Sequence, residues 1–255
     1  MIRTFVWFTY RKDAGILLRS VKSVLSIYPD ANIIVCDDVS SGSTLPTKAI
    51  SALKRMGAIM VPTAWPRQGN LRGWVCAKEI ATTLKWAYEI TGADVVVKID
   101  SDVIFLNGKW IEDFVQDETA IVAGTRSRCR RAVCGVAYAL RKEGLEALCD
   151  SYENDMASPY LTEEDFEMSS RLYRYCKGNE RMRLLPFSQS GVHPACADAE
   201  SGIYSWLQDT EQWQAYIVTH WQLAVIHPDN GLAKGNARSQ VAKRLMHLRN
   251  TLCRG

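Results

Sequence analysis

Short apolar runs alternate with amphipathic helical stretches over the first hundred residues, and this alternation limits the chain to few folds. The apolar runs have the length of buried strands and lie at Phe5–Phe8, Asn32–Cys36, Ala58–Val61 and Asp94–Asp100. Helical stripes of apolar residues separate them, over Leu17–Tyr28, Lys48–Met56 and Trp74–Tyr88. Repeated strand–helix–strand units predict an α/β fold with a mostly parallel sheet and helices on both faces.

The second half of the chain is less regular. We expect strands at Ala120–Ala123 and Val133–Leu140 and helices at Gly144–Cys149 and Thr162–Cys176. Two short apolar runs, Tyr216–His220 and Leu223–His227, each end in histidine. A last amphipathic helix is predicted over roughly Ala237–Leu252.

Composition excludes several classes of protein. The chain has 255 residues, of which 47% are hydrophobic and 23% charged, so it is neither disordered nor a coiled coil. No apolar run reaches the ~18 residues of a membrane span, and the N-terminus becomes charged too soon for a signal peptide. The eight cysteines are too dilute for a disulfide scaffold, and the absence of any Cys-x-x-Cys pair argues against a zinc site. We expect reduced thiols in a cytoplasmic protein.

The sharpest chemical feature is Asp100-Ser101-Asp102, directly after the apolar run Val95–Ile99. In open α/β sheets, ligands bind beyond the carboxyl ends of the strands. Two exposed carboxylates at that point would form a hard oxygen site for Mn²⁺ or Mg²⁺ that also grips a diphosphate. The alternative is an ordinary turn, because Asp and Ser are common turn residues.

Five segments together resemble a known family. They are FTYRKDAGILLRSVKSVL, VCDDVSSG, GNLRGW, VVVKIDSDVIF and TEEDFEMSSRLYRY, and their order and spacing are those of GT-A fold glycosyltransferases, closest to the inverting family 2 group. The resemblance covers about residues 4 to 227. It implies a single Rossmann-like domain over 1–229, with a nucleotide-sugar-binding half (1–106), an acceptor-binding half (107–229) and a basic helix (230–255) after it.

The resemblance also assigns roles in binding the donor nucleotide. Thr9, Tyr10 and Arg11 would contact the nucleotide, and Asp37 or Asp38 would accept hydrogen bonds from the base or ribose. The residues expected nearer the phosphates, ribose and metal are Asn70, Arg72, Asp100 and Ser101. Polar-turn and exposed-loop roles remain the alternatives for the Asp37–Asp38 pair and for Asn70 and Arg72.

The metal and the general base complete the implied site. Asp100, Asp102 and His220 would hold Mn²⁺ or Mg²⁺, with His227 as the alternative histidine. Asp165 is the first choice for the base that deprotonates the acceptor hydroxyl, and Glu164 is the second. Thr162 and Asp165 also have the spacing of a helix-capping box, which is a structural alternative.

The implied activity is metal-dependent transfer of a sugar, with inversion, from a nucleotide-sugar donor, UDP-sugar favoured, to an acceptor hydroxyl. His227-x-x-x-Gly231-x-x-Lys234 is similar, one residue out of register, to a phosphate-binding motif of retaining GT-A enzymes, which leaves retention as an alternative. A nucleotidyltransferase would need a Gly-rich loop after the first strand, where this chain has only Gly15. A non-catalytic nucleotide- or polyanion-binding module is the alternative outside enzymes.

Basic residues widen the range of acceptors. No acidic residue follows Asp229, whereas the segment contains six basic ones, and a second cluster lies at Arg126–Arg131. Such clusters are either solvated faces or contacts for an anionic partner. The family resemblance implies a glycan or lipid-linked sugar as the default acceptor. The basic residues add hydroxymethylated phage DNA as the alternative, and the basic helix is predicted to contact an anionic surface.

Overall fold

The computed structural model describes residues 1–40, 42–65, 73–105, 107–126, 133–154, 164–178, 180–185 and 225–226. In the first half, the strands and helices alternate as β1 (Arg3–Thr9), α1 (Ala14–Leu25), β2 (Asn32–Asp38), α2 (Thr47–Arg55), β3 (Ile59–Thr63), α3 (Trp74–Thr91) and β4 (Val95–Ile99). The elements that follow are β5 (Ile104–Phe105), α4 (Lys109–Gln116), β6 (Val122–Arg126), β7 (Val133–Leu140), α5 (Lys142–Asn154), α6 (Glu164–Tyr175), β8 (Met182–Leu185) and β9 (Val225–Ile226).

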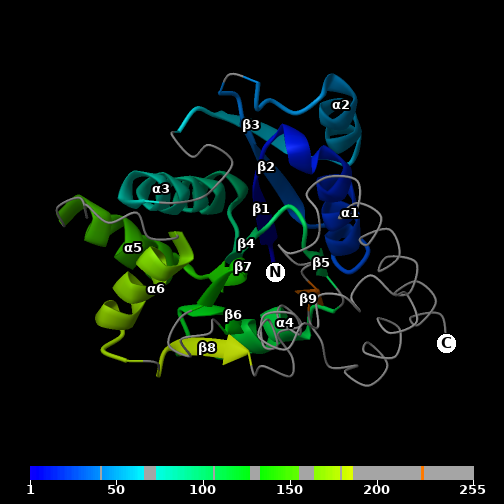
Figure 1. The fold of residues 1–255 in the computed structure, drawn as a ribbon. Coiled ribbons are helices and arrows are strands. Elements are labelled where there is room, and N and C mark those ends of the chain that lie inside the picture. Colours follow the sequence, from blue (N-terminus) through cyan, green and yellow to red (C-terminus); the bar gives the residue numbers. More distant parts are fainter. Residues whose placement is uncertain are drawn as a thin grey trace, which may run out of the picture.

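Seven strands form one sheet in the order β3-β2-β1-β4-β7-β6-β8 (Figure 1). β1 pairs in parallel with both β2 and β4, and β2 pairs in parallel with β3. β7 is antiparallel to both of its neighbours, β4 and β6. The prediction of a mostly parallel α/β sheet is confirmed, and the carboxyl ends of β1 to β4 meet at one edge.

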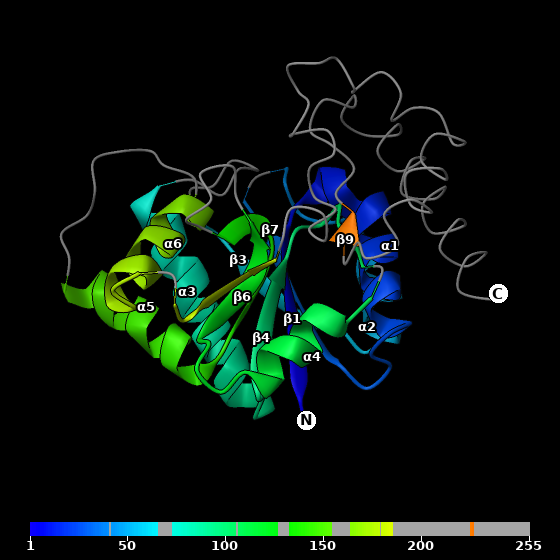
Figure 2. The same ribbon diagram turned by 90° about the horizontal axis from the view of Figure 1, so that it is seen from below.

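Helices cover both faces of the sheet, as the sequence predicts (Figures 1 and 2). Neighbouring residues of β1 point to opposite faces, so Trp7 joins one core with residues of α1 and α4, and Val6 joins the other with residues of α3, α5 and α6. Each fully buried aliphatic or aromatic side chain stabilises the fold by about 1.5–3 kcal/mol. Two separate cores therefore hold the helix layers on the sheet.

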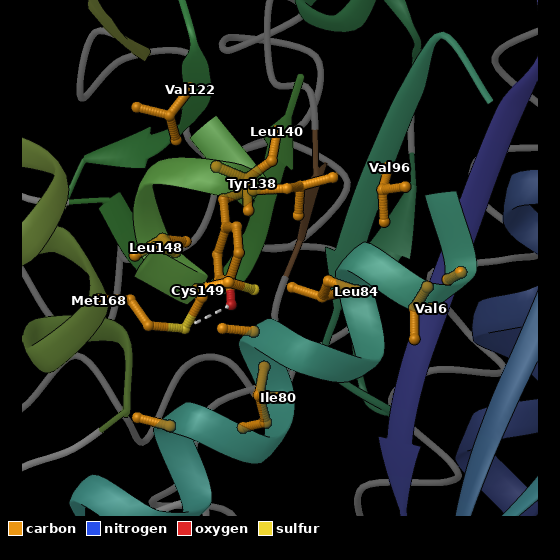
Figure 3. Packing of buried hydrophobic residues seen from close by; sticks show 14 of the residues in the cluster. Val6, Ile80, Leu84, Val96, Val122, Tyr138, Leu140, Leu148, Cys149 and Met168 are labelled. Carbon is orange, nitrogen blue, oxygen red and sulfur yellow. Dashed lines mark hydrogen bonds between the residues drawn. The ribbon is translucent and has the colours of Figure 1, made fainter. Parts of the chain in front are cut away.

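Tyr138 of β7 ties the second core together (Figure 3). Its ring lies among side chains of α3, α5 and α6, including Leu84, Leu148 and Met168. Its hydroxyl donates a hydrogen bond to Met168 Sδ at 3.2 Å. This packing fixes α6, which comes late in the sequence, against strands of the sheet.

Several expected elements differ in detail. α1 ends at Leu25, where Ser26 is the C-cap, so the helix does not continue to Tyr28. α5 extends well beyond Gly144–Cys149. Sequence patterns missed β5, β8 and α4; α4 has only eight residues, too few for a clear helical period, although it buries Trp110, Ile111 and Phe114. The apolar run at 216–220 and the helix predicted over 237–252 lie outside the described residues.

Candidate functional site

The predicted site residues of the first half gather at one edge of the sheet. Thr9, the last residue of β1, is the register partner of Asp37 in β2. Trp7 of β1 is paired with Ile99 of β4, so Asp100 begins the loop beside the end of β1. The Ser101 hydroxyl donates to the Phe8 carbonyl oxygen at 3.4 Å across these two strands. Figure 2 shows this edge opposite the one marked by the N-terminus.

The loops after β1 and β2 are joined to each other. The Arg11 N–H donates to the Ser43 carbonyl oxygen, which links the short 3₁₀ turn Arg11–Asp13 to the loop after β2. Thr9 is buried, whereas Arg11 is exposed. An exposed arginine beside this edge has the donors that suit a phosphate.

Asp37 and Asp38 lie inside β2 and are buried. Both carboxylate oxygens of Asp37 accept from the Leu45 N–H, at 3.0 and 3.2 Å. Asp38 Oδ1 accepts from the Ser40 N–H at 3.0 Å. These contacts shape the loop after β2, the turn role that the sequence left open, and contact of either residue with the donor stays a prediction.

Asp100, Ser101 and Asp102 form the turn that leaves β4, and the Val103 N–H donates to the Asp100 carbonyl oxygen at 3.2 Å. The Asp100 side chain is 32% exposed. Asp102 is only 6% exposed, so the expectation of two exposed carboxylates is wrong for this residue. The carboxylates therefore sit in different environments, one open to ligands and one enclosed.

Lys98 is the site residue that sequence reasoning missed. It belongs to β4, its side chain is 1% exposed, and it is the register partner of Tyr138. Its Nζ donates to Asp100 Oδ1 at 2.6 Å, to Glu164 Oε1 at 3.0 Å and to the Gly135 carbonyl oxygen. A lysine within the apolar run Val95–Ile99 was the available signal, because lysine is almost never fully buried unless it is paired.

Lys98 remains charged in this environment. Burial by itself lowers the pKa of a lysine, but the charges of Asp100 and Glu164 outweigh that effect and hold the pKa of Lys98 well above its usual value. The ammonium group is therefore a permanent positive charge at the base of the site.

Glu164 is the first residue of α6 and is buried against Lys98. Asp165 follows it in the same helix. The structure thus brings Glu164, the second choice for the base, within one shared ion-pair partner of Asp100, which is predicted to bind metal. Thr162, the capping alternative, lies outside the described residues.

The two aspartates of the turn after β4 carry the type of donor atom that suits a divalent cation. Asp100 and Asp102 offer hard carboxylate oxygens of the kind that Mg²⁺ and Mn²⁺ prefer. Asp100, Asp102 and Glu164 contribute three carboxyl groups to this region, and the Lys98 ammonium is paired with two of them, Asp100 and Glu164. Within the described ranges, no group of three or more His, Cys, Asp or Glu side chains is arranged to hold a metal.

Other predicted site residues lie outside the part of the chain that the structure describes. They are Asn70, Arg72, His220 and His227, together with the basic segment 230–255 and, in the other basic cluster, Arg128, Arg130 and Arg131. Arg126 ends β6. Among the cysteines with described side chains, Cys36, Cys76 and Cys149 are buried and Cys176 is partly buried, and no disulfide joins them to another described residue.

Comparison with solved structures identifies the fold. A glycosyltransferase involved in glycosylating the major capsid of PBCV-1 matches with a TM-score of 0.53 at 10% identity, over 97% of this chain and 100% of that one. The galactosyltransferase LgtC, in complex with donor and acceptor sugar analogues, matches with a TM-score of 0.52 at 12% identity, over 97% and 95% of the two chains. The mannosyltransferase PcManGT from Pyrobaculum calidifontis, in complex with GDP-Man and Mn²⁺, matches with a TM-score of 0.50 at 13% identity, over 96% and 69%.

This is the GT-A glycosyltransferase fold. No protein-family model and no curated protein matches the sequence. The membership in family 2 that the sequence motifs suggest is therefore not confirmed. In the GT-A fold, the carboxyl edge that carries Asp100 is the place where ligands of an open α/β sheet bind. No helix in the described ranges is long and apolar enough to cross a membrane.

Proposed function

We propose that this protein is a metal-dependent glycosyltransferase that transfers a sugar from a nucleotide-sugar donor to an acceptor hydroxyl. The observation that carries the proposal is the joining of Asp100, at the carboxyl end of β4, to the acidic start of α6 through Lys98. A GT-A fold with carboxylates at this edge has a place for a donor and, beside it, a place for a base.

The donor would lie along the edge formed by β1, β2 and β4. Thr9, Tyr10, Arg11 and Ser101 belong to the loops and strand ends at this edge. Arg11 can contact phosphate, and Asp37 or Asp38 can reach a base or ribose if the loop that they bind rearranges. PcManGT binds GDP-Man with Mn²⁺, and LgtC binds analogues of both substrates, which supports a nucleotide-sugar donor here. We favour a UDP-sugar.

Asp100 and Asp102 would hold Mn²⁺ or Mg²⁺, and His220 would complete the set. When bound, the ion supplies positive charge that stabilises the diphosphate leaving group. Lys98 holds Asp100 Oδ1 at 2.6 Å and so limits the orientations of that carboxylate.

Asp165 would take the proton from the acceptor hydroxyl. Glu164 is less suited to this task because its Oε1 is already bound to the buried Lys98 ammonium. Attack by the deprotonated oxygen on the anomeric carbon breaks the bond to the diphosphate and inverts the configuration.

A direct assay tests the proposal. The protein is incubated with Mn²⁺ and a panel of nucleotide sugars, and released nucleoside diphosphate and any sugar adduct are measured by mass spectrometry. Release that requires both the protein and the metal supports the proposal, whereas nucleotide binding without release would identify a binding module. The anomeric configuration of the product, measured by NMR, separates inversion from retention.

The acceptor is proposed to be a glycan or lipid-linked sugar. Hydroxymethylated DNA is the alternative because the C-terminal segment after Asp229 has six basic residues and no acidic one. A panel that includes glycans and hydroxymethylated DNA separates the two.

A further inference from the structure

We propose that Lys98 is a positioning residue that fixes the donor-side carboxylate of Asp100 and the start of α6 in one geometry. The inference rests on the proposed function and adds to it a part that no sequence motif indicates. Lys98 lies beneath the site, in β4, and reaches it only through the groups to which it donates.

The contacts of Lys98 satisfy an ammonium group completely. An ammonium has three N–H donors and no acceptor. Its three partners are Asp100 Oδ1, Glu164 Oε1 and the Gly135 carbonyl oxygen, which come from the loop after β4, from α6 and from β7. The centroid of the Tyr138 ring lies 5.7 Å from Nζ, so the face of the ring also attracts the ammonium charge through a cation–π interaction. One charge therefore sets the relative position of three segments that lie far apart in the sequence.

Stabilisation of the fold does not by itself account for the contacts of Lys98. A buried ion pair stabilises a protein little, because desolvation of the two charges offsets their attraction. α6 already has such a pair, in which Arg171 Nη2 lies 2.8 Å from Glu167 Oε1 and Arg171 Nη1 donates to the Ser151 carbonyl oxygen of α5. Lys98 differs from Arg171 in that one of its partners is 32% exposed at the edge where the donor would bind.

The decisive variant is Lys98→Met/Glu164→Gln. It removes one positive and one negative formal charge, so the net formal charge around Asp100 and Asp102 is unchanged. Asp100 loses its ion pair with Lys98, but its side chain is 32% exposed and so remains solvated. The matched control is Arg171→Met/Glu167→Gln, which removes the other buried pair of α6. Both variants keep Asp100, Asp102 and Asp165.

The measurement is calorimetric titration with Mn²⁺ in the presence of UDP or GDP, at a temperature below the thermal unfolding transitions of both variants. Loss of a group that orients a metal ligand typically costs about 10- to 100-fold in affinity or activity. We expect that loss of affinity in Lys98→Met/Glu164→Gln, and a fall of about 100-fold in kcat from misplacement of the reacting groups. The control variant should bind Mn²⁺ and nucleotide as the wild type does, although both variants lose stability.

Lys98→Arg provides a second test should the double variant not fold. It keeps the charge, but a planar guanidinium cannot direct its N–H groups at the same three acceptors. We expect weakened Mn²⁺ and nucleotide binding here too. Wild-type binding by Lys98→Arg, or by the double variant, would overturn the positioning role.

The inference and the proposed function fail in distinguishable ways. If the wild type binds Mn²⁺ and nucleotide but transfers and hydrolyses nothing, the proposed function is wrong, and the binding comparison still decides the role of Lys98. If the wild type transfers sugar and the double variant does so equally well, only the positioning role is wrong. A wild type that binds neither Mn²⁺ nor nucleotide overturns both.

Discussion

Lys98 Nζ lies 3.0 Å from Glu164 Oε1, an ion pair that joins the central strand β4 to the first residue of α6. The sequence places 65 residues between these two, yet the contact brings the predicted donor half and the predicted acceptor half together at one buried point. Because Asp165 follows Glu164, the contact also fixes the backbone from which the proposed base extends.

Replacing the proposed base should stop the chemistry and spare donor binding. Asp165→Asn removes a proton acceptor with little change in shape, and loss of a general base typically lowers the rate by ~10²–10⁴. We expect kcat to fall in that range while the donor Kd, from calorimetry, stays within a few-fold. If Asp165→Asn transfers normally and Glu164→Gln is inactive, Glu164 is the base. If neither change matters, these acids serve only the start of the helix.

Removing the metal or its enclosed ligand should abolish activity without unfolding the protein. Asp102 is 6% exposed, so the conservative Asp102→Asn is a cleaner test than alanine. We expect turnover to fall by orders of magnitude in this variant, and in the wild type treated with EDTA, because the leaving diphosphate loses its charge stabilisation. Circular dichroism checks that Asp102→Asn is folded, and full activity in EDTA would refute the metal requirement.

The basic C-terminal segment should give salt-dependent binding to an anionic partner. Each DNA phosphate neutralised adds about 0.9 to the magnitude of the slope of log affinity against log salt. Lys243→Ala/Arg244→Ala/Arg249→Ala should therefore bind duplex DNA more weakly and with a shallower slope, while donor hydrolysis is unchanged. Retention of the wild type on anionic liposomes but not on DNA would indicate a membrane surface instead. Binding to neither would identify the charge as a solvated face.

Acid should weaken the contact between α5 and Arg181, the residue that precedes β8. Arg181 donates to both oxygens of Glu143, at 2.6 Å each, and these hydrogen bonds lower the pKa of Glu143 below its usual value. A depressed folded-state pKa stabilises the protein above the unfolded-state pKa of ~4.3 and loses this effect as pH falls through the folded-state value. Urea unfolding should show that Glu143→Gln costs stability at pH 7 and less at pH 3. A constant cost across this range would contradict the linkage.

Gly124 of β6 should not tolerate a side chain. A Cβ at this position would lie 2.7 Å from the Ala137 carbonyl oxygen and 2.9 Å from the Tyr138 Cα, and neither backbone atom can move without disturbing β7. Overpacking of this kind typically costs about 1–3 kcal/mol. Gly124→Ala should lower the free energy of unfolding by that amount in urea titrations, and unchanged stability would show that the two strands can separate without cost.

The sequence determined the fold class because the patterns that indicate strands and helices lie within short segments of the chain. Apolar runs such as Val95–Ile99 and stripes such as Trp74–Tyr88 carry the strand and helix periods within themselves, and the helices that they predict are α1, α2 and α3. The position of Asp100 was predicted in the same way. It directly follows the apolar run Val95–Ile99, so it lies at the carboxyl end of the strand that this run forms. Short elements such as α4, with eight residues, hold too little pattern to be found in this way.

Tertiary structure alone decided which residues from distant parts of the sequence lie in contact. β7 is antiparallel between β4 and β6, and this places Gly135 and Tyr138 against Lys98, a pairing that depends on contacts between residues far apart in the chain. The burial of Asp37, Asp38 and Asp102 could not be predicted from the sequence either. A polar residue is expected to be exposed unless hydrogen-bond partners compensate for its burial, and the sequence does not show those partners. Local periodicity dictates which segments become strands and helices, whereas the free energy of burying a charge depends on partners that only the folded chain assembles.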